Sequence, residues 1–278
     1  MTAMRCNAAM LISRRARRAG LFAGVLGLAL SLGACTLGGG DNGALSTSGV
    51  GAQNTPMSPT ERTLWASGVE AENAHNYENA VSAFGNLFER RPTDVVVYTA
   101  FLRNLRYSGR AMDAVNYTQK NALRMLDDAG VKFEYGKAQL DAGRKGDALN
   151  TLREVAALTP ENWQVHSALG IAHDSMGQFN PAISAYLTAL RVSPNNVVVM
   201  NNLAISQAMA GKLQAAIDTL ESAAAINRTN THVRQNLALL YAANGEPEKA
   251  RALAAMDLDS GDLETNLSFY RRFGGIQP

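Results

Sequence analysis

Residues 163–196 read WQVHSALGIAHDSMGQFNPAISAYLTALRVSPNN, and this stretch sets the pattern of the chain. Numbered from its first residue, it places Gly170 at position 8, Ala182 at 20, Tyr186 at 24 and Pro194 at 32. Small residues at positions 8 and 20 let two helices cross closely, an aromatic ring at 24 fills the space between them, and the proline ends the second helix. The stretch therefore predicts a helix–turn–helix unit.

The same numbering continues without insertion on both sides of this unit. Six consecutive frames of 34 residues begin at residues 61, 95, 129, 163, 197 and 231, and the last one ends at 264. Position 20 is alanine in all six frames, and position 15 is glycine in five of them, with His75 as the exception. The frame at 95–128 is irregular, because Leu102 stands at position 8 and no proline stands at position 32.

These frames resemble tetratricopeptide repeats in length and residue pattern. Repeats of that family stack on one another, since a single unit cannot bury its apolar face alone. The resemblance implies an all-α protein, a right-handed α-solenoid of about six tetratricopeptide repeats over residues 61–264. In the tail at 265–278, Leu267, Tyr270 and Phe273 are spaced by three, which predicts a C-terminal capping helix over the last repeat.

The N-terminus has the pattern of an export signal. Four arginines between residues 14 and 18 precede an apolar run at 19–32 that is too short to span a bilayer. The next residues, up to Cys35, read LGAC and resemble the lipobox of bacterial lipoproteins. The resemblance implies a lipoprotein signal peptide at 1–34, cleaved after Ala34, and a covalent lipid on Cys35. The alternative is an ordinary secretory signal with a chance cysteine, and Met10 is an alternative start.

A polar segment separates the lipobox from the repeats. Residues 35–60 are rich in glycine, serine, threonine and asparagine, which predicts a flexible linker. Thr36, and not aspartate, follows the cysteine, and by the same resemblance this favours the outer membrane over the inner one. Several acyl chains on one residue anchor a protein stably. The expected location is therefore the periplasmic face of the outer membrane.

Charge and cysteine content exclude several classes of protein. Five of the 26 basic residues and none of the 24 acidic ones precede Cys35, which leaves 21 basic and 24 acidic residues and a net charge of −3. An acidic mature chain gives no electrostatic support to nucleic-acid binding. Cys6 is lost with the signal and Cys35 carries the lipid, so no thiol is left for a disulfide or a metal.

Residues for catalysis are not arranged in any recognisable motif. The chain has no HExxH, no GxSxG and no phosphate-binding loop between a strand and a helix. His166 and His173 are seven residues apart on one predicted helix, and we interpret them as interior packing residues and not as metal ligands. We therefore expect no enzymatic activity, no metal and no cofactor apart from the covalent lipid.

The repeat family binds peptides in the concave groove lined by its first helices. Carried over by position, the resemblance implies groove contacts at Trp65, Arg103, Arg106, Tyr107, Phe133, Lys137, Ile171, Asn201 and Ile205, with Asn202 and Asn236 at position 6. The groove would have a basic patch at Arg103 and Arg106 and an apolar C-terminal half. The alternatives are a solvated groove with scattered apolar residues, and a purely structural role for the asparagines.

The whole layout resembles the TadD family, the tetratricopeptide lipoproteins of the Flp (tight adherence) pilus system. The lipobox, the polar linker, the six repeats and an ending with Asn266, Leu267, Tyr270, Arg271 and Arg272 carry this resemblance. It implies a non-enzymatic scaffold whose partner is an outer-membrane secretin or another pilus component, and which helps that secretin assemble or localise, as pilotins do. Type IVa pilotins and general periplasmic scaffolds for envelope or peptidoglycan enzymes are the alternatives.

Overall fold

The computed structural model describes residues 55–257, and these residues form twelve α-helices, one 3₁₀ helix and no strand. The elements are α2 (Pro59–Asn73), α3 (Tyr77–Arg90), α4 (Val95–Tyr107), α5 (Ala111–Asn121), η1 (Leu123–Asp127), α6 (Ala129–Asp141), α7 (Lys145–Leu158), α8 (Trp163–Ser175), α9 (Phe179–Val192), α10 (Val197–Met209), α11 (Leu213–Ile226), α12 (Thr231–Ala243) and α13 (Pro247–Ala254). The signal peptide, Cys35, most of the predicted linker and the predicted capping helix lie outside the described residues.

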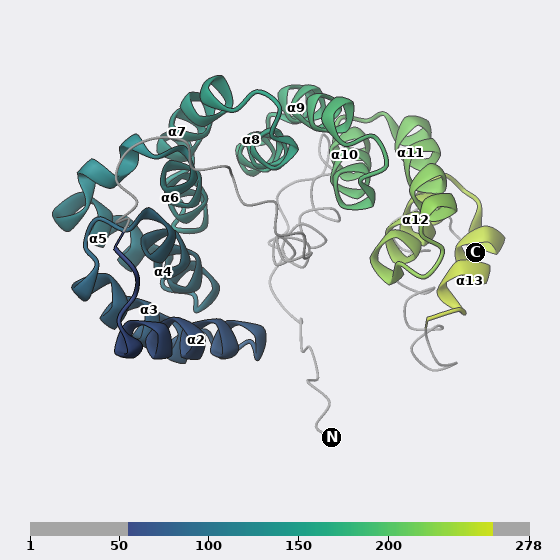
Figure 1. Cartoon of the computed structure of the whole chain (residues 1–278). Helices are drawn as coiled ribbons and strands as arrows, with labels where there is room; N and C mark the ends of the chain where they lie inside the picture. The colour runs from purple at the N-terminus through teal and green to yellow at the C-terminus, as the bar shows by residue number, and fades with distance from the viewer. Residues whose placement is uncertain (1–54, 258–278) are drawn as a thin grey trace, which may run out of the picture.

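The helices form an arc of successive pairs (Figure 1). The first helices α4, α6, α8, α10 and α12 lie on the inner side of the arc, and the second helices α5, α7, α9, α11 and α13 lie on the outer side. Five first helices begin at position 1 of their frames, at residues 95, 129, 163, 197 and 231. The predicted α-solenoid is therefore confirmed, with one helix pair for each frame.

Local hydrogen bonds fix where the first helices begin. The last residue of each of the first five frames, position 34, is an N-cap whose side chain accepts a hydrogen bond from a backbone N–H of the first turn. These caps are Asp94, Asp128, Asn162, Asn196 and Asn230. At α2, Ser58 and Glu61 form a reciprocal capping box. Helix boundaries therefore follow from local chemistry as well as from packing.

The turns within the pairs require a left-handed backbone at position 15. Gly109, Gly143, Gly177, Gly211 and Gly245 have φ between 71° and 80°. His75 occupies the same position in the first pair with φ 56°. A side chain in this region costs about 1 kcal/mol relative to glycine. The His75 ring lies against Tyr77, and its Nδ1 is 2.8 Å from the Tyr77 hydroxyl.

Close helix crossing within a pair depends on positions 8 and 24. A Cβ atom on Gly170 would lie 2.4 Å from Cε1 of Tyr186, so the ring occupies the space that a side chain on Gly170 would need. The same contact recurs between Gly68 and Phe84 at 2.7 Å, and between Gly136 and Leu152 at 3.0 Å. In each of these pairs, glycine on the first helix accommodates a large side chain on the second.

The irregular second pair reverses this arrangement. Leu102 at position 8 and Thr118 at position 24 are both fully buried, so the large residue is on the first helix and the small one on the second. The Thr118 hydroxyl lies 2.7 Å from the hydroxyl of Tyr98, which satisfies both buried groups. Position 32, which is not proline in this frame, lies in η1, the 3₁₀ helix that follows the short α5. The second pair therefore packs closely because its large and small side chains have exchanged positions.

Buried apolar clusters follow one another along the arc. Successive clusters involve α3 to α6, then α6 to α8, then α9 and α10, and finally α10 to α13. Because each cluster joins neighbouring repeats, no repeat holds a core of its own, as expected of a solenoid. Within residues 55–257, no helix combines the length and the hydropathy needed to cross a membrane.

Substituting Gly170 tests the close crossing. We expect Gly170→Ala to lower the free energy of unfolding by about 1–3 kcal/mol, because the new methyl group overlaps the Tyr186 ring. Gly146→Ala is the matched control, since Gly146 lies in α7 with no atom of another side chain within 4 Å of the position that a Cβ would take. That substitution should be neutral or stabilising by up to about 1 kcal/mol. Urea unfolding measures both; equal effects would contradict the packing argument.

Candidate protein-interaction surface

The predicted groove residues all lie on the first helices, but they differ in exposure. Seven are half-buried, namely Trp65, Arg103, Tyr107, Ile171, Asn201, Asn202 and Asn236. The other four, Arg106, Phe133, Lys137 and Ile205, are buried, with 5–9 % of their surface exposed. A buried side chain offers a partner little contact area without local movement. Contact with a partner stays a prediction for each of these residues.

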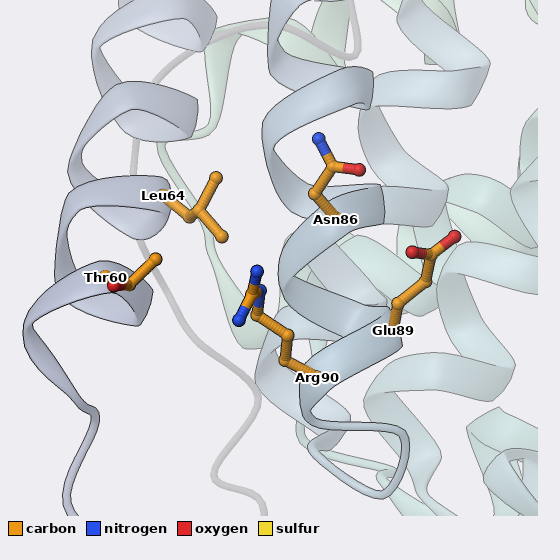
Figure 2. A pocket seen from close by; sticks show the side chains of 5 residues that line it. All are labelled: Thr60, Leu64, Asn86, Glu89 and Arg90. Atoms are coloured by element: carbon orange, nitrogen blue, oxygen red, sulfur yellow. The ribbon is translucent and has the colours of Figure 1, made fainter.

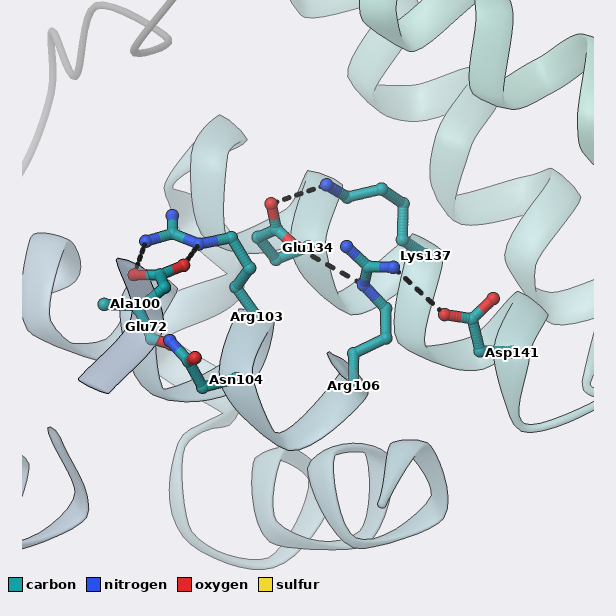
Figure 3. A network of polar contacts seen from close by, with 8 residues as sticks. All are labelled: Glu72, Ala100, Arg103, Asn104, Arg106, Glu134, Lys137 and Asp141. Carbon is teal, nitrogen blue, oxygen red and sulfur yellow. Dashed lines mark hydrogen bonds and ion pairs between the residues drawn. The ribbon is translucent and has the colours of Figure 1, made fainter. Parts of the chain in front are cut away.

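Charged side chains join α2, α4 and α6 in one network of polar contacts (Figure 3). Arg103 donates from Nε and Nη2 to the two carboxylate oxygens of Glu72, at 2.6 and 2.8 Å. Arg106 donates from Nη1 to Asp141 at 3.1 Å, and its Nε lies 3.7 Å from Glu134. Lys137 Nζ donates to Glu134 at 2.6 Å. Three cations and three carboxylates therefore neutralise one another across three helices.

This network corrects the predicted basic patch. Arg103 is paired with Glu72, and Arg106 is 8 % exposed and faces Glu134 and Asp141. Neither guanidinium presents free positive charge. The prediction was wrong because it assigned charge by position within one repeat, whereas the neutralising carboxylates come from neighbouring repeats.

At the centre of the network, burial and ion pairing shift the pKa values of the charged groups in opposite directions. Burial by itself raises the pKa of Glu134, but the adjacent Lys137 and Arg106 hold that pKa below its ordinary value. Burial lowers the pKa of Lys137, and Glu134 acts against this shift. Nε and Nη2 of Arg106 and Oε2 of Glu134 are buried, and none of them has a hydrogen-bond partner among the residues that the structure describes. The cost of removing these charges from water offsets much of their mutual attraction, so the network by itself adds little net stability.

In the C-terminal half of the arc, hydroxyl and amide groups form hydrogen bonds that link neighbouring helices. Tyr186 donates its hydroxyl to Asp174 at 2.8 Å, and Ser206 Oγ lies 2.8 and 2.7 Å from the two carboxylate oxygens. Asp174 is 9 % exposed, and burial raises its pKa to about 6. Asn236 donates from Nδ2 to Oδ1 of Asn201 at 2.8 Å, so both amides link α10 to α12. This half combines partly exposed apolar residues with amides.

The histidines on α8 contact their own chain. His166 Nε2 lies 2.7 Å from the carbonyl oxygen of Pro160, and His173 Nδ1 lies 2.7 Å from Oε1 of Gln178. Both rings are half-buried, so they lie at the edge of the packing and not in its interior as predicted. Among the described residues, no group of three or more metal-ligating side chains could hold an ion.

A pocket lies at the N-terminal end of the arc, between α2 and α3 (Figure 2). Thr60 and Leu64 line it from α2, and Asn86, Glu89 and Arg90 line it from α3. These side chains contain no nucleophile next to a base, which acyl or phosphoryl transfer would require. The pocket therefore supports no catalytic assignment.

Comparison with known proteins identifies the repeats. Family models described as tetratricopeptide repeat match residues 133–175, 167–231 and 207–262. The chain thus contains tetratricopeptide repeats, and its fold is that of a protein-interaction scaffold. Proteins of this fold are generally non-enzymatic. No curated protein matches the sequence as a relative.

Several solved structures share the fold. A tetratricopeptide repeat protein from Parabacteroides merdae ATCC 43184 is 13% identical, with a TM-score of 0.59 over 78% of this chain and 90% of that one. MamA from Desulfovibrio magneticus RS-1 is 15% identical, with a TM-score of 0.50 over 64% of this chain and 95% of that one. A second MamA structure is 18% identical, with a TM-score of 0.50 over 63% and 97% of the two chains. Similarity at this level indicates a common fold alone.

Substituting Lys137 tests the charge network. Lys137→Met should lower the free energy of unfolding by about 3 kcal/mol, because it leaves the buried Glu134 carboxylate without its closest cation. Lys132→Met is the matched control on the same helix; Lys132 pairs with Glu154, which is 64% exposed, and its loss should cost less than about 1 kcal/mol. Similar losses in the two variants, measured by urea unfolding, would contradict a buried network.

Proposed function

We propose that this protein is a lipid-anchored, non-enzymatic scaffold that helps the secretin of the Flp pilus assemble or localise, as pilotins do. The observation that carries the proposal is the combination, in one chain, of a tetratricopeptide solenoid with a lipobox and a polar linker ahead of it. The solenoid supplies a surface for protein partners, and the lipid on Cys35 would hold that surface at the periplasmic face of the outer membrane.

The inner side of the arc supports binding of a peptide segment more than binding of a polyanion. Its N-terminal half carries paired charges, and its C-terminal half carries amides with partly exposed apolar residues such as Ile171. A helix or an extended segment of a partner protein can match such a surface along several repeats. A secretin segment that reaches the periplasm is the partner we propose.

Deletion of the gene tests the proposed partner. We expect fewer secretin multimers in the outer membrane and fewer surface pili, with normal amounts of secretin monomer, because assembly and not synthesis is impaired. Semi-native gels of membrane fractions and pilus counts measure the two effects. Loss of multimers of a type IVa secretin would instead assign the protein to the type IVa pilotins. Normal multimers together with co-purifying peptidoglycan enzymes would replace the proposal with a general envelope scaffold.

Substituting Cys35 tests the anchor. Cys35→Ser should move the protein from the membrane to the soluble periplasmic fraction, because the residue that carries the acyl chains is lost. Thr36→Ser, next to it, is the matched control and should stay with the outer membrane. Fractionation and immunoblotting measure both variants, and a Cys35→Ser protein that remains in the membrane would refute lipid anchoring.

A further inference from the structure

Asp174 differs from the two carboxylates of α6 described above. The buried Glu134 and the exposed Asp141 have cationic partners within 4 Å, whereas no ion pair to Asp174 is present within residues 55–257. Among the described residues, its carboxylate accepts hydrogen bonds from two hydroxyl groups, those of Tyr186 on α9 and Ser206 on α10. One buried charge thus joins three helices that belong to the fourth and fifth repeats.

The charged groups on the surrounding elements are engaged elsewhere. On α8, His166 and His173 lie against Pro160 and Gln178. On α9, Arg191 is exposed and donates to Thr188, and α10 contains no charged residue. On α6, Lys132, Glu134, Lys137 and Asp141 form the ion pairs described above. On α7, Lys145 donates to the carbonyl oxygen of Ser175, and Arg153 is exposed. The two acidic residues of this helix are in ion pairs, Asp147 with Arg144 and Glu154 with Lys132. Within residues 55–257, none of the basic groups on these helices pairs with the Asp174 carboxylate.

An uncompensated buried carboxylate favours its protonated form. Burial raises the pKa of Asp174 from 3.8 to about 6, and the two hydroxyl donors only partly offset this. An acid whose pKa is raised by burial binds a proton more tightly when it is buried than when water reaches it. The stability that Asp174 gives to the contact between α8, α9 and α10 is therefore fully present below about pH 4. It falls as the pH rises and reaches its lower level above about pH 6.

We propose that the contact between α8, α9 and α10 is a pH-sensitive joint, which tightens when Asp174 is protonated and loosens when it is ionised. The Asp174–Ser206 hydrogen bond is the element that opens, because it links the first helices of two repeats directly. Opening lets water reach the carboxylate and changes the angle between the fourth and fifth repeats. Ile171 and Ile205 lie on the same two helices, so the inner surface presented to a partner changes with pH.

Hydrogen exchange of the full-length mature protein tests this joint. After correction for intrinsic exchange, amides of α8 and α10 should lose protection about 10-fold between pH 5 and pH 7.5, because pH 5 lies about one unit below the folded-state pKa of about 6. Asp174→Asn should abolish this dependence, because the amide is neutral at both pH values and retains groups that can bond to Tyr186 and Ser206. Asp218→Asn, an exposed aspartate on α11, is the matched control and should keep the dependence.

Two further measurements test the proposal even if the Asp174→Asn variant does not fold. Tyr186→Phe removes one hydroxyl donor from the carboxylate and should move the pH midpoint of the protection change upward. A carboxyl-carbon NMR titration of the unmodified protein should give Asp174 a midpoint near 6. The proposal is overturned by an ordinary aspartate midpoint, by a pH dependence that persists in Asp174→Asn, or by a midpoint that does not move in Tyr186→Phe.

Discussion

The structure depends on the close crossing of two helices within each repeat. In the first, third and fourth repeats a large side chain at position 24 fills the crossing and position 8 is glycine, as Gly170 is beneath Tyr186. The requirement concerns the pair and not either position alone, because the second repeat meets it with Leu102 and Thr118 exchanged in size. Tight crossings of this kind fix the shape of each repeat, so that the next repeat can stack on a defined surface.

Much of this fold could be predicted from the sequence, because its determinants are local. The 34-residue spacing places the helices, and the asparagine or aspartate at position 34 was a further signal for helix starts that the repeat pattern alone did not use. Contacts between repeats could not be predicted. Glu72 and Arg103 are 31 residues apart and Arg106 and Asp141 are 35 apart, and only the rotation between successive repeats decides that such residues meet. For the same reason the burial of Arg106 was missed.

The two halves of the inner surface hold their repeats together by different means. In the N-terminal half, each buried charge has an opposite charge near it, and the pKa of Glu134 is held low, so its carboxylate stays ionised at neutral pH. Removing Lys137 would leave the buried Glu134 carboxylate without its closest cation, and removing Glu134 would leave the buried Lys137 without its carboxylate. In the C-terminal half, hydroxyl and amide groups form the links between the first helices, and no ion pair joins them within residues 55–257.

This difference bears on how a partner can bind. A partner that approaches the N-terminal half meets charges that are already satisfied, so it gains little electrostatic energy without displacing Asp141 or Glu72 from its arginine. In the C-terminal half, a partner can alter the angle between repeats by breaking only neutral or singly charged hydrogen bonds. The two sections of the inner surface therefore differ in the contacts that a partner would have to displace, which are ion pairs in the N-terminal section and hydroxyl or amide hydrogen bonds further along the chain.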